Sequence, residues 1–316
     1  MSVFDVTALG EVLIDFTPCG TSEGGRNLFE QNPGGAPANV LAALSRLGRK
    51  TAFIGKVGED MHGLLLKETL EDCGVDVSGM LVDPAYFTTL AFVALKDGER
   101  SFSFARKPGA DTRLTKEEVR TELLKKTKIF HCGSLSLTDE PARSATLYAV
   151  ETARKAGALI SYDPNYRAPL WRSQEEAVAQ MRSLIPFVDI MKISDEETAL
   201  LTGCREPEDA AEALLQQGVS CAVVTLGGDG ALMRTKQFCI REKGRKRQGV
   251  DTTGAGDSFW GGILDRFAET GADPEKLTEE QGREFLRFAN AVAGICVERR
   301  GGIPAMPSLE EVQKEL

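Results

Sequence analysis

Two carboxylates bracket a short glycine-rich turn in the run Asp251-Thr252-Thr253-Gly254-Ala255-Gly256-Asp257, and an apolar pattern of helical spacing follows it. The N-terminus of a helix presents free backbone N–H groups, which favour an anion. The glycines at 254 and 256 let the main chain approach that anion closely. Asp257, in the first helical turn, could accept a proton. The run therefore predicts an oxyanion or phosphate site beside a base, which is the equipment of phosphoryl transfer.

The same residue types would also suit an ordinary helix start. Thr252 or Thr253 could cap the helix, and a carboxylate at position 257 would complement the helix dipole. We favour the functional interpretation because glycine, alanine, glycine and aspartate occur in direct succession. With an ordinary pKa of about 3.9, Asp257 is expected to be ionised at neutral pH. It would be a weak base, which suffices where a loose transition state requires little proton abstraction.

Other polar segments lie where predicted elements begin or end. They are Asp15, Gly34-Gly35-Ala36-Pro37-Ala38-Asn39, Asp163-Pro164-Asn165-Tyr166-Arg167 and Thr225-Leu226-Gly227-Gly228-Asp229-Gly230. Asp15 and Asn39 carry oxygens suited to sugar hydroxyls, and Arg167 could hold a phosphate or a substrate oxygen. The last run would suit a nucleotide. Each segment also suits an ordinary turn or strand end, so none identifies a function by itself.

Several common catalytic patterns are missing from the sequence. No G-x-x-x-x-G-K-S/T run predicts a P-loop, and Phe259 stands where a dinucleotide fingerprint needs its third glycine. The two histidines, His62 and His131, fall in a predicted helix and a predicted buried strand. We therefore expect neither nicotinamide chemistry nor a Ser-His-Asp or histidine-metal site.

Strands and helices alternate between these segments. Strands are expected at 3–9, 51–55, 129–132, 158–163, 190–193 and 222–226, and helices at 38–47, 62–73, 141–155, 258–267 and 282–297. This order predicts an α/β fold with a Rossmann-like, mostly parallel sheet and helices on both faces. Ligands of such sheets bind beyond the carboxyl ends of the strands, where Asp163, Gly227 and the 251–257 turn could converge.

Two stretches interrupt the alternation. Residues 11–31 are strand-like with a glycine-rich turn, and residues 87–106 predict a hairpin that turns at 96–99. We expect a single domain over residues 1–316, in which these strands form a small β-sheet lid. An extension of the main sheet at its edge would explain them equally well.

The composition narrows the choice of function. The chain has 316 residues, 42% of them hydrophobic, and a formal net charge of −9, which argue for a self-sufficient core and against a sequence-independent grip on nucleic acid. Its seven cysteines include no C-x-x-C pair, as in reduced cytosolic proteins. No signal-peptide pattern or membrane-length apolar run occurs. We expect a cytoplasmic protein that binds neither nucleic acid nor a membrane.

Two segments together resemble the signatures of a known enzyme family. Gly34–Gly48 (GGAPANVLAALSRLG) is similar to the first signature of the ribokinase-like (PfkB) family of carbohydrate kinases, and Asp251–Phe259 (DTTGAGDSF) is similar to the second. Their order and spacing fit over essentially the whole chain. Within the family, residues 130–137, 161–171 and 192–197 are most similar to fructokinases.

The resemblance implies that ATP, with Mg²⁺, phosphorylates a primary sugar hydroxyl, converting D-fructose to fructose 6-phosphate in the fructokinase subgroup. Asp257 would be the general base, and Gly254, Ala255 and Gly256 would form the anion hole. The implied sugar-binding residues are Asp15, Gly34, Gly35, Asn39, Arg106 and Arg167. The implied nucleotide-binding residues are Ser194, Thr225, Gly227, Gly230 and Asn290.

The resemblance also implies a place for cations. Glu197 would position Mg²⁺ through water; many ribokinase relatives have N-x-x-E here, whereas this chain has Ser194 at the asparagine position. The resemblance extends to a monovalent cation such as K⁺ beside Asp251 and Thr253, and to a homodimer joined through the lid. The residues alone give no sign of either.

Other functions stay open at this point. A related kinase for ribose, 2-keto-3-deoxygluconate or aminoimidazole riboside would share the anion hole and differ in the sugar pocket. A non-catalytic regulator that binds a sugar or nucleotide is a third reading, against which the retention of Asp257 argues. The basic run 241–247 is expected to be a solvated loop, with a contact from Lys246 or Arg247 to ATP as the less favoured alternative.

Overall fold

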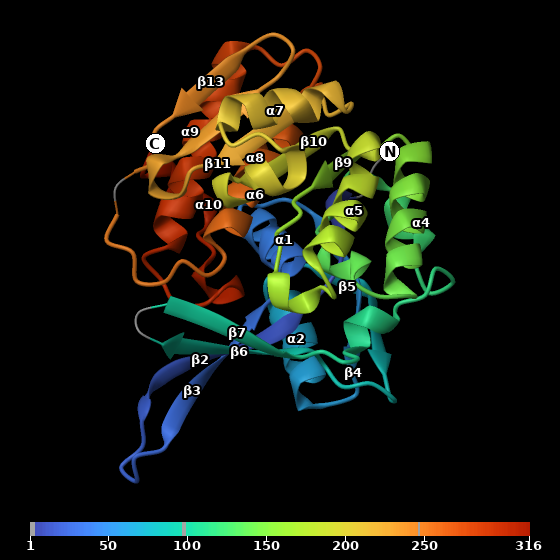
Figure 1. The fold of residues 1–316 in the computed structure, drawn as a ribbon, viewed down its shortest axis with the longest axis vertical. Helices are drawn as coiled ribbons and strands as arrows, with labels where there is room; N and C mark the ends of the chain where they lie inside the picture. The colour runs from blue at the N-terminus through green and yellow to red at the C-terminus, as the bar shows by residue number, and fades with distance from the viewer. Residues whose placement is uncertain (1–3, 97–98, 246) are drawn as a thin grey trace.

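The computed structural model describes residues 4–96, 99–245 and 247–316, and its larger sheet has nine strands (Figure 1). These are β1 (Phe4–Leu9), β4 (Thr51–Gly58), β5 (Asp76–Asp83), β8 (Thr127–Cys132), β9 (Leu159–Tyr162), β10 (Ile190–Ser194), β11 (Cys221–Thr225), β12 (Ala231–Arg234) and β13 (Cys239–Glu242). Their order is β13-β12-β11-β10-β9-β8-β1-β4-β5. Neighbours from β11 to β5 pair in parallel, and β12 and β13 add an antiparallel edge.

Helices cover both faces of this sheet, as predicted. One face carries α1 (Ala36–Arg46), α2 (Met61–Asp72), α8 (Ala255–Thr270) and α9 (Glu279–Cys296), with the short α10 (Leu309–Gln313) beside α9. The other carries α3 (Thr121–Leu124), α4 (Ala142–Lys155), α5 (Gln174–Leu184), α6 (Asp195–Thr202) and α7 (Pro207–Gln216). Because successive strand residues face opposite sides, Val223 of β11 joins one core and Val224 joins the other.

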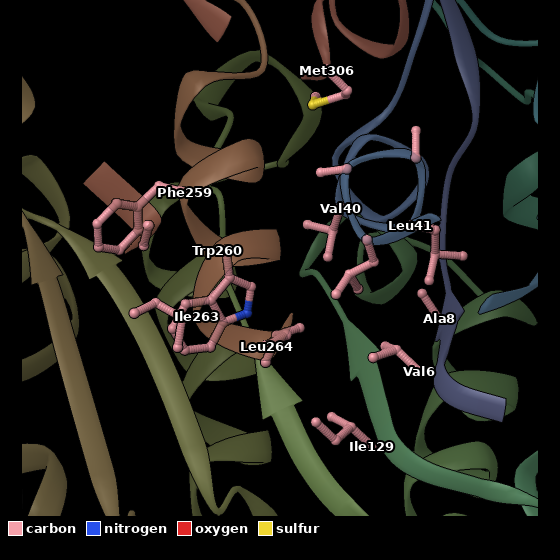
Figure 2. Close-up of a cluster of buried hydrophobic side chains, with 14 of the residues drawn as sticks. Val6, Ala8, Val40, Leu41, Ile129, Phe259, Trp260, Ile263, Leu264 and Met306 are labelled. Atoms are coloured by element: carbon pink, nitrogen blue, oxygen red, sulfur yellow. The ribbon is translucent and has the colours of Figure 1, made fainter. Parts of the chain in front are cut away.

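Helix α8 is held tightly against the sheet and against α1. Figure 2 shows its apolar side chains within the core, among them Trp260 and Ile263, with Val40 of α1 facing them. The two helices come close because Gly261 has no side chain: a Cβ there would lie 2.8 Å from the Cβ of Ala43. This packing fixes the start of α8, where the predicted anion turn lies.

A second, smaller sheet stands apart from the first (Figure 1). Its strands are β2 (Leu13–Thr21), β3 (Asn27–Gly34), β6 (Leu90–Lys96) and β7 (Glu99–Ala105). They lie in the order β3-β2-β6-β7, with β2 and β6 parallel and the two outer pairs antiparallel. The strands come from the two stretches that interrupt the alternation, so these stretches do not extend the main sheet. Residues 97–98 of the predicted turn lie outside the described residues.

Two absences in the described part of the chain bear on the expectations from sequence. No helix there is long and apolar enough to cross a membrane. All seven cysteines are free thiols.

Candidate active site

The predicted anion turn forms the start of α8. Gly254 is the N-cap residue with φ 74°, and no side chain caps the helix. Thr253 instead donates hydrogen bonds from its N and Oγ1 to Oδ1 of Asp251, at 3.0 and 2.8 Å. The alternative of a threonine cap is therefore wrong. Because the first N–H groups of an α-helix have no intrahelical acceptor, this helix start remains suited to an anion.

A cavity of about 570 Å³ opens beside this turn. Its walls include the small sheet, the start of α1, strand β10, the loop at 250–254 and the start of α8. It brings together most of the residues predicted for catalysis, for the sugar and for a monovalent cation, namely Asp15, Gly35, Asn39, Arg167, Asp251, Thr253, Gly254, Gly256 and Asp257. Parts of the chain that are distant in sequence thus meet at one site, as the rule for parallel sheets predicts.

Asp257 is oriented by a neighbouring amide. The residue is 8% exposed, and its Oδ2 accepts a hydrogen bond at 2.8 Å from Nδ2 of Asn39. Burial and the nearby Asp163 raise the pKa of Asp257 to about 6, although Asn39 and Lys192 act to lower it. The carboxylate is still mostly ionised at neutral pH. It is a stronger base than its ordinary pKa of about 3.9 would make it.

The part of the site around Asp15 depends on two glycines that leave room for other groups. A Cβ at Gly34 would lie 2.7 Å from Oδ2 of Asp15, and a Cβ at Gly35 would lie 2.6 Å from the carbonyl oxygen of Glu11. Gly35 also has a φ of 114°, which favours glycine. Burial raises the pKa of Asp15 to about 7; Arg167 opposes this shift and Asp257 adds to it.

Two buried charged residues of this region were missed by the sequence analysis. Glu11 accepts a hydrogen bond from the N of Ala36 at 3.0 Å, and burial raises its pKa to about 7. Lys192 of β10 donates to Oδ2 of Asp163 at 2.7 Å. A lysine inside the apolar strand at 190–193 was the available signal, because lysine is almost never fully buried unless it is paired.

Ser194 and Thr225, both predicted to bind the nucleotide, end neighbouring strands. Ser194 of β10 pairs in register with Thr225 of β11. Neither residue lines the cavity, but Lys192 does, two residues before Ser194 on the same strand. Of these two strands, only β10 therefore reaches the cavity wall among its lining residues, through Lys192.

Gly227, Gly230 and Asn290, also predicted for the nucleotide, do not line the cavity either. Gly227 and Gly230 have φ values of 55° and 99°, and a Cβ at Gly230 would lie 2.1 Å from the carbonyl oxygen of Glu242. Nδ2 of Asn290 donates to the carbonyl oxygen of Lys243 at 3.3 Å. These contacts shape the loops that follow β11 and β13.

The two candidate arginines are placed differently. Arg167 is exposed and lines the cavity. Arg106 does not line it; its guanidinium donates to Oδ2 of Asp111, Oγ1 of Thr138 and the carbonyl oxygen of Leu135, each at 2.8 Å. In this structure Arg106 joins the end of β7 to the main domain.

Glu197, the residue expected to place Mg²⁺, is engaged at the start of α6. Its Oε1 accepts from the N of Tyr166 at 2.7 Å, and its Oε2 accepts from the N of Ser194 at 2.8 Å. Oε2 also accepts from Oγ of Ser194 at 3.2 Å, whereas Oε1 has a second lone pair, so a contact of Oε1 with Mg²⁺ through water fits this arrangement. No group of three or more His, Cys, Asp or Glu residues forms a metal site in the described parts of the chain. Magnesium is commonly held by one or two carboxylates together with substrate phosphates.

The basic run at 241–247 makes surface ion pairs. Arg241 pairs with Glu208, and Arg245 pairs with Glu315 at 3.2 Å. Lys246 lies outside the described residues. Arg241 belongs to strand β13, so the expected loop begins only after Glu242, and Arg247 pairs with Glu298 at 3.4 Å.

The sheet, the uncapped helix start and the cavity between the two sheets define an α/β protein with a polar cavity at the carboxyl edge of its main sheet. Residues 4–309 match the model of the pfkB family carbohydrate kinases. The chain belongs to this family.

Relatives within the family match nearly the whole chain. Fructokinase-1 of Zea mays is 45% identical over 312 residues, covering 97% of this chain and 96% of that protein. A fructokinase structure with bound ATP from Xylella fastidiosa has 34% identity and a TM-score of 0.91, covering 98% of this chain and 97% of the other. A fructokinase variant from Vibrio cholerae O395, bound to fructose, ADP and potassium, has 31% identity and a TM-score of 0.89, covering 99% of both chains. These findings confirm the predicted fold and family.

Proposed function

We propose that this chain transfers the γ-phosphoryl group of ATP to the primary hydroxyl of D-fructose, giving fructose 6-phosphate. One observation carries the proposal: the carboxylate of Asp257 lies beside the uncapped start of α8, on a cavity that also contains Asp15 and Asn39. A terminal phosphate and a sugar hydroxyl can meet there. Fructose is chosen because the relatives described above are fructokinases.

The proposed roles follow from this placement. Asp15, Gly35 and Asn39 bind the sugar, while Asp257 accepts the proton of the attacking hydroxyl as the new O–P bond forms. The backbone N–H groups of the turn at 254–256 stabilise the charge on the phosphoryl oxygens. Bound Mg²⁺ would neutralise phosphate charge, and Glu197 would hold it through water.

We further propose that the small sheet closes over the sugar and excludes water. The support is its contribution of Asp15, Val93 and Phe104 to the cavity wall. Exclusion of water would suppress ATP hydrolysis. The ADP release measured without sugar should therefore be far slower than with sugar; equal rates would contradict closure.

The proposed nucleotide and cation sites are supported by where the predicted residues lie and by the ligands of related structures. Ser194, Thr225, Gly227, Gly230 and Asn290 lie at the ends of β10 and β11 or on neighbouring segments, and two related structures hold ATP or ADP. We place a monovalent cation beside Asp251 and Thr253, with support from the potassium-bound relative. Replacing K⁺ by tetramethylammonium in the assay tests that placement.

A homodimer through the small sheet is also proposed. Phe29 and Phe92 are 44% and 38% exposed and make an edge-to-face contact with each other on this sheet. Such an exposed apolar surface is typical of an interface, and sedimentation equilibrium tests it. We propose a cytoplasmic location because all seven cysteines are free thiols.

The experiment that tests the function is a coupled assay of ADP release over a sugar panel. D-Fructose should give the highest kcat/KM, above ribose, 2-keto-3-deoxygluconate and aminoimidazole riboside. A higher value for another sugar would make the chain a different kinase of the same family. No ADP release with any sugar would favour a non-catalytic regulator.

A further inference from the structure

Lys192 is a buried cation in the cavity without a role in the function proposed above. Three cationic residues line this cavity within the described part of the chain: Arg167, Lys192 and Arg300. Arg167 is exposed, and the side chain of Arg300 is 62% exposed and lies 3.8 Å from Glu30. Lys192 is only 5% exposed. It is therefore the cation that the fold itself places inside the site.

The ammonium group of Lys192 faces the anion turn. A Cβ at Gly256 would lie 3.5 Å from Nζ of Lys192, so the glycine leaves the space that the ammonium faces. Oδ2 of Asp163 accepts a hydrogen bond from Nζ at 2.7 Å and anchors it from the sheet side. An ammonium has three N–H donors. The bond to Asp163 uses one of them, which leaves donors for a ligand in the cavity.

The carboxylates that line the cavity explain why a buried cation would be useful there. Burying an ion pair is costly, and apolar residues of similar size often stabilise a fold equally well, so stability alone does not account for the pair of Lys192 and Asp163. Asp15 and Asp257 also line the cavity, and their negative charge would repel an incoming phosphate. A compact ammonium is a common phosphate ligand that offsets such repulsion.

We propose that Lys192 is a further catalytic residue, whose ammonium donates a hydrogen bond to an oxygen of the phosphoryl group in transfer, and that Asp163 positions it. The inference rests on the proposed kinase function. In the step, the bond from the sugar oxygen to phosphorus forms and the bond from phosphorus to the leaving oxygen of ADP breaks. The hydroxyl proton passes to Asp257. Lys192 keeps its three protons throughout and stabilises the charge on the phosphoryl oxygens.

The first test is steady-state kinetics of Lys192→Met, with Lys56→Met as the matched control. Lys56 is also buried, at 6% exposed, and its Nζ lies 2.7 Å from Glu118 and 3.4 Å from Asp83, but it does not line the cavity. Losing a preorganised donor to a transition state typically lowers kcat by about 10²–10³-fold. We expect that loss in Lys192→Met, whereas Lys56→Met should lose stability and keep its kcat. Equal kcat in folded Lys192→Met and the wild type would overturn the proposal.

The double variant Lys192→Met/Asp163→Asn guards against misfolding, because it removes both charges of the buried pair together. It should fold and show the same loss of kcat. A double variant with normal kcat would also overturn the proposal.

A pH profile separates direct catalysis from an effect on the base. Lys192 acts to lower the pKa of Asp257, so its removal should shift the acid limb of activity to higher pH. If that were its whole role, kcat would recover at alkaline pH. The proposal requires the loss to persist on the alkaline plateau.

A binding measurement keeps the inference independent of turnover. Calorimetry with Lys192→Met should show a weaker affinity for adenylyl imidodiphosphate and little change for ADP, because only the former carries the terminal phosphate. Equal changes for both nucleotides would contradict a contact with that phosphate. If the wild type phosphorylated no sugar, the proposed function would fail while this comparison would still test the contact.

Discussion

The two glycine turns of this protein look similar in sequence and differ in their surroundings. Gly254 and Gly227 have positive φ values of 74° and 55°. The first begins a helix of 16 residues, and a Cβ there would lie 3.2 Å from the Cα of Gly302. The second begins a three-residue 3₁₀ turn, and a Cβ there would meet nothing within 4 Å. The turn at Gly254 thus lies at the positive end of a helix dipole and is fixed by packing. The turn at Gly227 has neither a long helix after it nor close packing around the glycine.

The charges around the two turns differ in the same way. Asp257 beside the first turn is buried, and burial raises its pKa to about 6. Asp229 within the second turn is exposed. Water screens an exposed charge, whereas a buried one acts strongly on its neighbours. We therefore expect chemistry at the first turn and nucleotide contacts at the second.

The largest expected effect is that of Asp257→Ala. Loss of a general base lowers the rate by at least about 10²-fold, so kcat should fall by that factor. Asp229→Ala in the other turn is the matched control and should retain most of the wild-type kcat. The coupled ADP assay measures both variants. Near-normal turnover of folded Asp257→Ala would remove this residue from the role of base.

The second-largest effect is expected in Gly254→Ala, with Gly227→Ala as its counterpart in the other turn. Both place a side chain at positive φ and should lose about 1–2 kcal/mol of stability in urea unfolding. Gly254→Ala should also lower kcat by about 10²-fold, because small displacements of catalytic groups cost that much. Gly227→Ala should act mainly on the KM for ATP. Equal effects of both variants on kcat would break the distinction between the turns.

The pH dependence sharpens the same contrast. As the proposed base, Asp257 works when ionised, so activity should be highest above about pH 7 and fall below its pKa, which is about 6. The profile of kcat/KM, which reports the free enzyme, should also contain the ionisation of Asp15, whose pKa is about 7. Asn39→Ala removes the hydrogen bond that lowers the pKa of Asp257 and should shift the acid limb upward. An unchanged profile in Asn39→Ala would contradict this assignment.

The smallest expected effect is a change in the free energy of unfolding of Asp15→Asn, measured without ligand. The folded-state pKa of about 7 lies above the ordinary value of about 3.9, so the folded state binds the proton more tightly. Stability of the wild type should therefore fall as pH rises from about 4 to 7. Asp15→Asn should raise the free energy of unfolding at pH 8 by about 1–2 kcal/mol and weaken sugar binding. Chemical unfolding at pH 4 and pH 8 checks the sign, since the gain should vanish at pH 4.

Local signals were enough to predict the turns and the alternation of elements. Glycines at positions 254 and 256 and the apolar helical pattern that follows them mark this turn in the sequence itself. The short strands β12 and β13, of four residues each, leave too little pattern to be recognised. Strand β5 and helices α5, α6 and α7 were also not singled out; α6 begins directly after β10, without an intervening loop.

Burial and pairing of charges could not be predicted from single positions. Lys192 and Glu11 owe their burial and their hydrogen bonds to neighbours that are distant in sequence, such as Ala36 for Glu11. Arg106 at the end of a strand looks the same whether it faces a sugar or, as here, Asp111. Such assignments depend on the tertiary arrangement and not on local propensity.

The division of the site between the two sheets has an evolutionary consequence. Asp15 belongs to β2 of the small sheet, whereas Asp257 belongs to α8 on the main sheet. In the function proposed above, part of the selectivity for the acceptor alcohol thus lies on the small sheet, whereas Asn39 of α1 and the bond-making residues lie on the main domain. Mutations that accumulate in the four-stranded module can change the preferred carbohydrate while the phosphate chemistry stays intact.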